Sequence, residues 1–300
     1  MTYTEEPLAF ACLNETLLGI LSVPGADAQT GVVIVVGGPQ YRAGSHRQFV
    51  LLARALAMAG HAVLRFDYRG MGDSSGPARD FQDVSPDIAA AVDAMQRRLP
   101  QVRKVALWGL CDGASAALLY CHEHRDPRIA GLCLLNPWVR SEASLARTQV
   151  KHYYAQRLLQ REFWQKLITG KVAFDALSGL LRSVRMSTRA ATAPSGATSF
   201  QQRMAEAWLG FSGSILLLLS GDDYTAKEFV EYASSDAAWT VALQRNALQR
   251  HAIEAADHTF SDSKSRLEVE KLVIEWLSTE LTQTSAPASS AHSAMTSMEA

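Results

Sequence analysis

No apolar segment of this sequence is long enough to cross a membrane. No purely aliphatic run is longer than the one at residues 215–219, whereas a spanning helix needs about 20 apolar residues. The chain begins MTYTEE, which is acidic and shows neither the basic region nor the apolar region of a signal peptide. We therefore expect a cytoplasmic protein that does not insert into membranes.

Cysteine is scarce, and neither sign of charge prevails. The four cysteines show no C-x-x-C spacing, which argues against a disulfide framework and fits a reducing compartment. Lys and Arg number 29 and Asp and Glu 30, so the chain offers no broad basic surface for nucleic acid. A dinucleotide loop is excluded, because Gly70 and Gly72 are followed by Gly76 and Pro77 rather than by a glycine at position 75. We expect no metal, no cofactor and no nucleic-acid partner.

The sequence does contain enough apolar residues for a large core, since 48% of its 300 residues are hydrophobic. The run VVIVV at residues 32–36 is typical of a strand buried on both faces, as in a parallel sheet. Further strands are expected after an opening hairpin, with amphipathic helices between them, at residues 62–66, 105–108, 129–135, 215–219 and 252–255. This alternation predicts an α/β fold in which helices flank a mostly parallel sheet.

The alternation stops after residue 137. Residues 138–212 show helical periodicity, so we expect them to form a helical cap inserted into a core made of residues 1–137 and 213–281. Aromatic residues of this segment would line an acyl pocket or form the core of the cap itself. Residues 282–300 are rich in Ser, Ala and Thr, which predicts a disordered tail.

The clearest chemical motif is G-x-C-x-G at residues 109–113, where a strand pattern runs directly into a helix pattern. This is the context of a nucleophile elbow. The glycines permit a strained backbone that projects the central side chain above the sheet edge, and the N-terminus of a helix favours a reactive thiol. We predict that Cys111 is the nucleophile.

A cysteine nucleophile needs a base, and eight histidines compete for this role. In doubly wound sheets the site lies at the carboxyl ends of the strands. His258 follows the carboxyl end of a late strand, whereas His251 lies at the opposite end of that strand. We predict His258 as the base and consider His46, in the loop after the first parallel strand, as a residue that could contact substrate.

The third member of such a triad is a carboxylate that orients the imidazole, and it comes between nucleophile and histidine in the sequence. The segment SGDDY ends the penultimate strand and offers Asp223, our first choice, and Asp222 as the fallback. The alternative acid position, after the preceding strand, holds Asn136, which carries no charge.

An oxyanion hole requires two converging N–H groups. Asp112, the residue after the nucleophile, should supply one of them. The loop at residues 37–42 should supply the other, and because Pro39 has no N–H, the candidates are Gly38 first and Gln40 second.

Four strings carry a family resemblance: GGPQYRAGSHRQF, LRFDYRGMGDS, WGLCDGASAAL and SGDDYTAKEF. The second contains the D-x-R-G-x-G-x-S turn of α/β-hydrolases, and together the four resemble the exosortase A system-associated hydrolase type 1 family. The resemblance covers the sheet from about residue 8 to residue 281. It implies an α/β-hydrolase whose catalytic serine is replaced by cysteine, as in dienelactone hydrolases and polyhydroxyalkanoate synthases.

These residues predict a hydrolase of esters, thioesters or lactones that works through a Cys-His-Asp triad and a covalent thioester. Its substrate would be a small acyl compound, free or bound to a carrier. Two alternatives stay open: an acyltransferase that uses the same intermediate, and a catalytically silent binding protein on a hydrolase scaffold.

Overall fold

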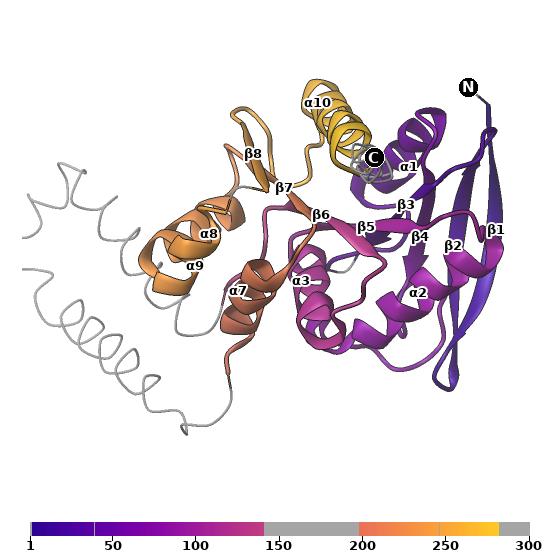
Figure 1. The fold of residues 1–300 in the computed structure, drawn as a ribbon, viewed down its shortest axis with the longest axis horizontal. Coiled ribbons are helices and arrows are strands. Elements are labelled where there is room, and N and C mark those ends of the chain that lie inside the picture. Colours follow the sequence, from indigo (N-terminus) through magenta and orange to yellow (C-terminus); the bar gives the residue numbers. More distant parts are fainter. Residues whose placement is uncertain (1, 39, 141–197, 246, 282–300) are drawn as a thin grey trace, which may run out of the picture.

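The computed structural model describes residues 2–38, 40–140, 198–245 and 247–281, and an eight-stranded sheet runs through it (Figure 1). The strand order is β1-β2-β4-β3-β5-β6-β7-β8. β1 and β2 form an antiparallel hairpin, β2 pairs antiparallel with β4, and all other neighbours are parallel. The strands are β1 (Tyr3–Cys12), β2 (Glu15–Pro24), β3 (Thr30–Val35), β4 (Ala62–Asp67), β5 (Lys104–Leu110), β6 (Ile129–Leu135), β7 (Ser214–Ser220) and β8 (Leu248–Ile253). The predicted α/β-hydrolase fold, with its mostly parallel sheet flanked by helices, is confirmed.

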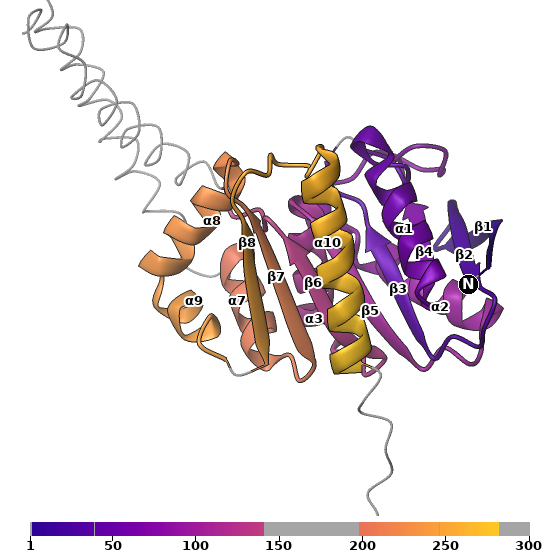
Figure 2. The same ribbon diagram turned by 90° about the horizontal axis from the view of Figure 1, so that it is seen from above.

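Helices cover both faces of this sheet, with α1 and α10 on one face and α2, α3 and α7 on the other (Figure 2). The described α-helices are α1 (Gln48–Met58), α2 (Ser85–Arg98), α3 (Asp112–His124), α7 (Phe200–Gly210), α8 (Tyr224–Ser235), α9 (Ala237–Ala242) and α10 (Ser263–Trp276). Two short 3-10 helices, η1 (Ser45–Arg47) and η2 (Phe81–Asp83), and a short π-helix, η4 (Leu277–Leu281), complete the described helices.

The position of β3 between two layers of helices explains why its sequence is an unbroken apolar run. Val33 and Val35 belong to the core cluster under α2 and α3, whereas Val32 and Ile34 belong to the cluster under α1 and α10. Alternate side chains of a strand point to opposite faces, so a strand covered on both sides needs apolar residues at every position.

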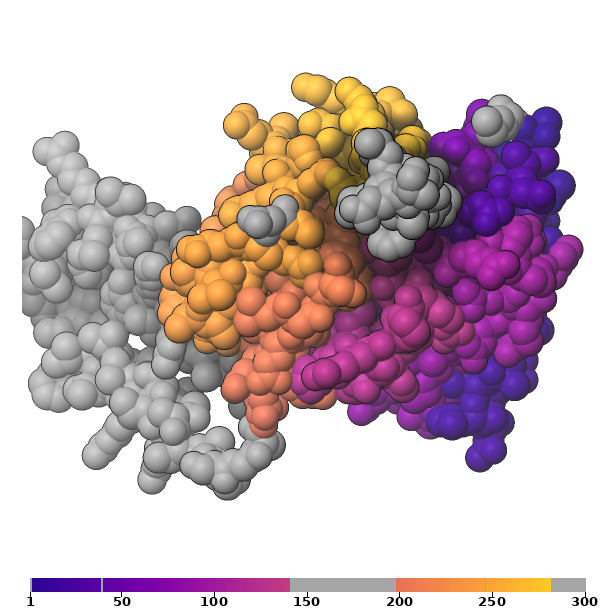
Figure 3. Space-filling model, in the orientation of Figure 1, coloured from indigo at the N-terminus to yellow at the C-terminus, as the bar shows by residue number. Residues whose placement is uncertain are grey.

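Most of the expected insertion, residues 141–197, lies outside the described residues, as does the expected tail at 282–300. The last part of the expected insertion forms α7, which packs against α3. Trp208 of α7 is fully buried in the same cluster as α3, and its ring meets Trp239 of α9 edge to face, with centroids 5.5 Å apart. Residues 200–210 therefore pack with the core layer, where α7, α8 and α9 form one end of the described molecule (Figure 3).

The last strand differs from its predicted position. β8 spans Leu248–Ile253 and ends where we expected only the middle of the strand, so the prediction of 252–255 was displaced by a few residues. The strand lies at the sheet edge and is mostly half-buried, so its residues do not form an apolar run. No helix within the described ranges is long and apolar enough to cross a membrane.

A buried ion pair fastens the turn after β4 to α2. The guanidinium of Arg69 donates to both carboxylate oxygens of Asp87, at 2.6–3.0 Å, and the two side chains are 4% and 0% exposed. The backbone N–H of Arg69 donates to the same carboxylate at 2.8 Å. Arg69 is the arginine of the D-x-R-G motif, so this motif has a structural role.

We expect Asp87→Ala to lower the free energy of unfolding by about 3–5 kcal/mol, because it leaves a buried guanidinium without its counter-charge. Arg98→Ala is the matched control, since the pair of Arg98 with Glu6 is solvent-exposed and should contribute less than about 1 kcal/mol. Denaturant titration measures both values. Equal losses in the two variants would contradict a structural role for the buried pair.

Candidate active site

Cys111 lies at a strained turn between β5 and α3. Its φ and ψ angles are 60° and −124°, a conformation that L-residues rarely adopt. A Cβ atom at Gly109 would lie 2.5 Å from the backbone of Gly113, and one at Gly113 would collide with the carbonyl oxygen of Val35. The two glycines therefore let strand and helix approach closely enough to hold Cys111 in this conformation, half-buried at the sheet edge.

His258 follows β8 and meets Asp223, which follows β7. Nδ1 of His258 lies 2.9 Å from Oδ2 of Asp223. Asp223 is 8% exposed and also caps the N-terminus of α8, where it accepts from the N–H groups of Thr225 and Ala226 at 3.2 and 3.0 Å. Burial acts to raise the pKa of Asp223, but its hydrogen bonds, above all with His258, outweigh burial and hold this pKa below its usual range.

The imidazole of His258 joins this carboxylate to the sulfur. Hydrogen bonds to Asp223 and to the side chain of Cys111 raise the pKa of His258 to about 10, against the opposing effect of burial. Because Nδ1 is engaged by Asp223, Nε2 is the ring nitrogen that remains for Cys111. Three residues from separate parts of the sequence thus form one chain of contacts.

The fallback acid, Asp222, does not take part in this chain. Its side chain is 85% exposed and lies 3.9 Å from Nζ of Lys227. The backbone turn that makes Asp223 an N-cap points the two neighbouring carboxylates in different directions.

Asn136 holds the backbone that carries His258 in place, a role that we did not predict. This fully buried residue accepts from the N–H of Ser220 at 2.8 Å and donates to the Ser220 hydroxyl at 2.7 Å and to the carbonyl of His258 at 3.2 Å. The Ser220 hydroxyl in turn donates to the carbonyl of Asp257 at 2.8 Å. The signal for this role in the sequence is a polar side chain directly after a buried strand.

The loop after β3 approaches the elbow. The N–H of Gly38, our first choice as oxyanion donor, donates to Oδ2 of Asp112 at 2.8 Å, so it is not free in this structure. Oε1 of Gln40 accepts from the backbone N–H of Ser45 and from Nε2 of Gln48, at 3.4 and 3.2 Å. The Gln40 side chain thus anchors the loop to the start of α1.

Arg42, at the end of this loop, is tied to Asp67 at the end of β4. Asp67 is completely buried and accepts from the backbone N–H of Arg42 at 2.7 Å, from its guanidinium and from the N–H of Asp73 at 3.1 Å. Asp67 is the aspartate of the D-x-R-G motif, so this motif also positions the loop beside Cys111.

A cavity of about 510 Å³ opens above the elbow. Its described lining is Gly37, Gly38, Gln40, Phe49, Asp80, Phe81, Leu110, Cys111, Asp112, Trp138 and His258. Four of these side chains are apolar or aromatic, which suits an acyl group. His46 is exposed in η1 and is not among the described residues that line this cavity, so its contact with a substrate stays a prediction.

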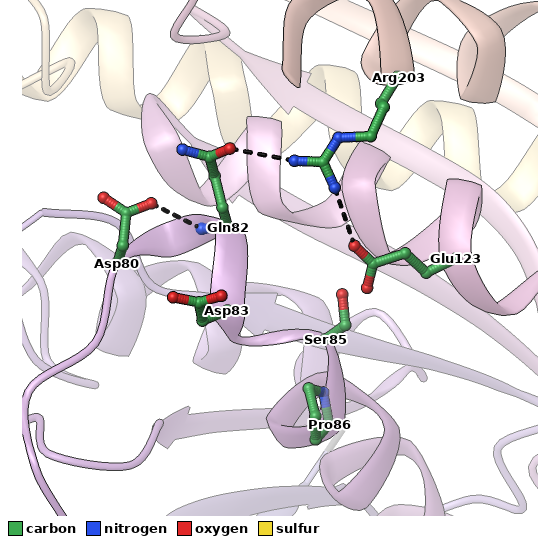
Figure 4. Close-up of a pocket in the computed structure, with 7 residues that line it drawn as sticks. All are labelled: Asp80, Gln82, Asp83, Ser85, Pro86, Glu123 and Arg203. Atoms are coloured by element: carbon green, nitrogen blue, oxygen red, sulfur yellow. Dashed lines mark hydrogen bonds and ion pairs between the residues drawn. The ribbon is translucent and has the colours of Figure 1, made fainter. Parts of the chain in front are cut away.

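A second cavity, of about 480 Å³, shares Asp80 with the first (Figure 4). Arg203 of α7 reaches across it and donates to Oε1 of Gln82 at 3.0 Å and to Glu123 at 3.2 Å, and Asp80 accepts from the N–H of Gln82. These polar groups pair with one another and join α7 to α3 and η2. Within the described ranges, no three His, Cys, Asp or Glu residues are grouped to hold a metal ion.

The raised pKa of His258 predicts how its contribution to stability varies with pH. The folded chain holds this proton more tightly than the unfolded chain, so the stabilisation is fully present below about pH 6.5 and is lost as pH rises through about 10. The difference in unfolding free energy between wild type and His258→Gln should therefore be larger at pH 6 than at pH 10. Denaturant titrations across this range measure it.

His61 provides a comparison of opposite sign. Burial lowers its pKa, so the advantage of wild type over His61→Gln should grow as pH rises toward about 6.5. A His258 difference that is flat, or that grows with pH, would contradict the pairing with Asp223.

The sequence profile of the family described as serine aminopeptidase, S33, matches residues 27–205, more than half of the chain. Solved structures are similar in fold. An esterase of Pyrococcus furiosus superposes with a TM-score of 0.62 at 16% identity and 93% coverage of each chain. A dienelactone hydrolase of Anabaena variabilis has a TM-score of 0.60 at 15% identity, with 93% of this chain and 99% of that chain covered.

A third structure, Est1E of Butyrivibrio proteoclasticus with bound ferulic acid, has a TM-score of 0.61 at 17% identity, with 92% of this chain and 99% of that chain covered. A comparison with curated protein sequences found no significant match. The family match extends over β3 to α7 and includes the elbow. The chain therefore belongs to the serine aminopeptidase S33 family and is an α/β-hydrolase enzyme.

Proposed function

We propose that this enzyme hydrolyses carboxylic esters, thioesters or lactones with Cys111 as nucleophile, His258 as general base and Asp223 as the carboxylate that orients His258. The observation that carries the proposal is the continuous contact from Asp223 through His258 to Cys111 at the floor of the cavity. The family is named for a serine enzyme, and this chain has cysteine at the elbow.

In the first half of the reaction the sulfur attacks the substrate carbonyl as a thiolate, with its proton already held on Nε2 of His258, as the raised pKa of this imidazole indicates. A carbon–sulfur bond forms while the carbonyl π electrons move to oxygen. The tetrahedral intermediate collapses, the bond to the leaving group breaks, and that group takes the proton from His258. The product on the enzyme is a thioester at Cys111.

In the second half water attacks the thioester while His258 accepts one of its protons. Collapse breaks the carbon–sulfur bond, releases the acid and leaves the proton on His258 beside the freed sulfur. Asp223 stays ionised throughout, which fits its lowered pKa, and its charge stabilises the imidazolium in each half.

The other three cysteines are poor candidates for this chemistry. Cys12, Cys121 and Cys133 are 3%, 9% and 1% exposed. Burial raises the pKa of all three, that of Cys121 to about 12, because an apolar interior disfavours the thiolate. Cys111, by contrast, opens onto the cavity.

The substrate class follows from the cavity and from the similar proteins. Phe49, Phe81, Leu110 and Trp138 offer apolar contacts for an acyl chain or ring. The similar structures include an esterase and a dienelactone hydrolase.

A panel of p-nitrophenyl esters, acyl thioesters and lactones tests the proposal. We expect turnover of at least one class by wild type and a loss of at least about a thousandfold in Cys111→Ala, because no other group replaces the sulfur. Free acid should be the main product even when an alcohol or amine is added. Undiminished activity in Cys111→Ala would contradict the nucleophile, and acyl transfer without hydrolysis would contradict the reaction class.

Two neighbouring acids allow a matched test of the triad. Asp223→Asn should lower kcat/KM by about 10²–10⁴-fold, because an amide neither stabilises the imidazolium nor holds its tautomer. Asp222→Asn should change kcat/KM less than about threefold, because its side chain is exposed and does not reach His258. Steady-state kinetics with the best ester of the panel decides. Similar losses in both variants would contradict Asp223 as the orienting acid.

A further inference from the structure

The carboxylate of Asp112 lies at the N-terminus of α3, directly beside the elbow. Its Oδ2 accepts the N–H of Gly38 at 2.8 Å. The N–H groups of Asp112 itself and of Gly113 face the same carboxylate and favour its charged form, although Oδ1 is buried without a well-formed hydrogen bond from any described residue. Three backbone donors from two elements thus surround one side chain.

The loop after β3 is shaped around this carboxylate. A Cβ atom at Gly37 would collide with Oδ1 of Asp112 and would lie 2.7 Å from the backbone nitrogen of Gly113. Gly38 has a φ of 60°, which glycine adopts without strain and which turns its N–H toward the carboxylate. Only a residue without a side chain at position 37 leaves room for the oxygen.

If the proposed function holds, these donors are the ones that the substrate needs. In this fold the oxyanion hole consists of the N–H of the residue after the nucleophile and an N–H from the loop after β3. Here those groups belong to Asp112 and Gly38, and both face the Asp112 carboxylate.

We propose that Asp112 controls acylation by occupying the oxyanion hole with its own carboxylate, which must turn out before the carbonyl oxygen of an acyl donor can enter. The inference rests on the proposed function of Cys111. The acyl donor and the carboxylate compete for the same N–H groups. Asp112 therefore slows acylation and selects donors that bind well enough elsewhere in the cavity to displace it.

The surroundings of Asp112 favour such a displacement. Burial raises its pKa, and the nearby charge of Asp80 acts in the same direction, so the carboxylate is held in a place that disfavours its charge. Asp112 also lines the cavity, so a turn about its side-chain bonds brings the carboxylate toward solvent.

Two reactions of the same sulfur separate this role from a general effect on Cys111. Acylation by p-nitrophenyl acetate passes through a tetrahedral oxyanion and needs the hole. Alkylation by iodoacetamide is a direct displacement of iodide by sulfur and forms no oxyanion. The side chain of Asp112 should therefore affect the first reaction and not the second.

The experiment compares wild type with Asp112→Ala and Asp112→Asn. Stopped-flow measurement of the p-nitrophenol burst gives the acylation rate, and peptide mapping of Cys111 gives the alkylation rate. We expect acylation at least tenfold faster in Asp112→Ala, a smaller gain in Asp112→Asn, which keeps an oxygen in the hole, and alkylation within about threefold in both. Asp83→Asn removes an exposed carboxylate outside this cavity, and neither rate should change.

Asp112→Asn keeps the shape of the side chain, so it tests the proposal even where Asp112→Ala fails to fold. Acylation that is unchanged or slower in the folded variants overturns the proposal. A parallel rise of both rates also overturns it, because it assigns the effect to access or to sulfur reactivity. A wild type and variants that are all alkylated at Cys111 but never acylated would instead refute the proposed function.

Discussion

The site depends on one close backbone contact, between Gly109 at the end of β5 and Gly113 in the first turn of α3. A Cβ atom on either residue would meet backbone atoms at 2.5 Å or less. This contact keeps Cys111 at a positive φ angle, where the sulfur stands above the sheet edge at the N-terminus of a helix. The strain is stored locally and is offset by a large core on both faces of the sheet. Parallel strands then bring Asp223 and His258 to the same edge, because both follow carboxyl ends of neighbouring strands.

Buried polar groups hold the loops around this edge. Asp67 fixes the loop after β3 through Arg42, and Asn136 fixes the turn that carries His258 through Ser220 and the His258 carbonyl. Asp67 and Asn136 are fully buried, and hydrogen bonds compensate the burial of their polar groups. Apolar packing thus stabilises the sheet of this α/β-hydrolase, and the buried carboxylate of Asp67 and amide of Asn136 fix the positions of its loops. Asp112 is the exception, because its carboxylate engages the loop at the position where a substrate oxygen is expected.

The local sequence pattern was enough to predict the fold, the elbow, and the order in which cysteine, acid and histidine follow one another in the chain. It favoured Asp223 over Asp222 but did not decide between them, because the direction of each side chain depends on the N-cap geometry of α8. The contact between Gly38 and Asp112 joins residues 74 positions apart, and periodicity carries no information about it. The prediction for the edge strand β8 was displaced by a few residues because a half-exposed strand lacks an apolar run. Helical periodicity was expected in the segment that holds α7, but it did not indicate that α7 packs against α3.

The proposed mechanism requires that an acyl group becomes attached to Cys111 during turnover. Rapid acid quenching with a p-nitrophenyl ester, followed by mass spectrometry of the intact protein and its peptides, measures this directly. One added acyl mass is expected on the peptide that contains Cys111, and neutral hydroxylamine should remove it because it cleaves thioesters. Continued turnover with the acyl group on another residue, or with no acylated enzyme in Cys111 peptides at any quench time, would contradict a covalent intermediate at Cys111.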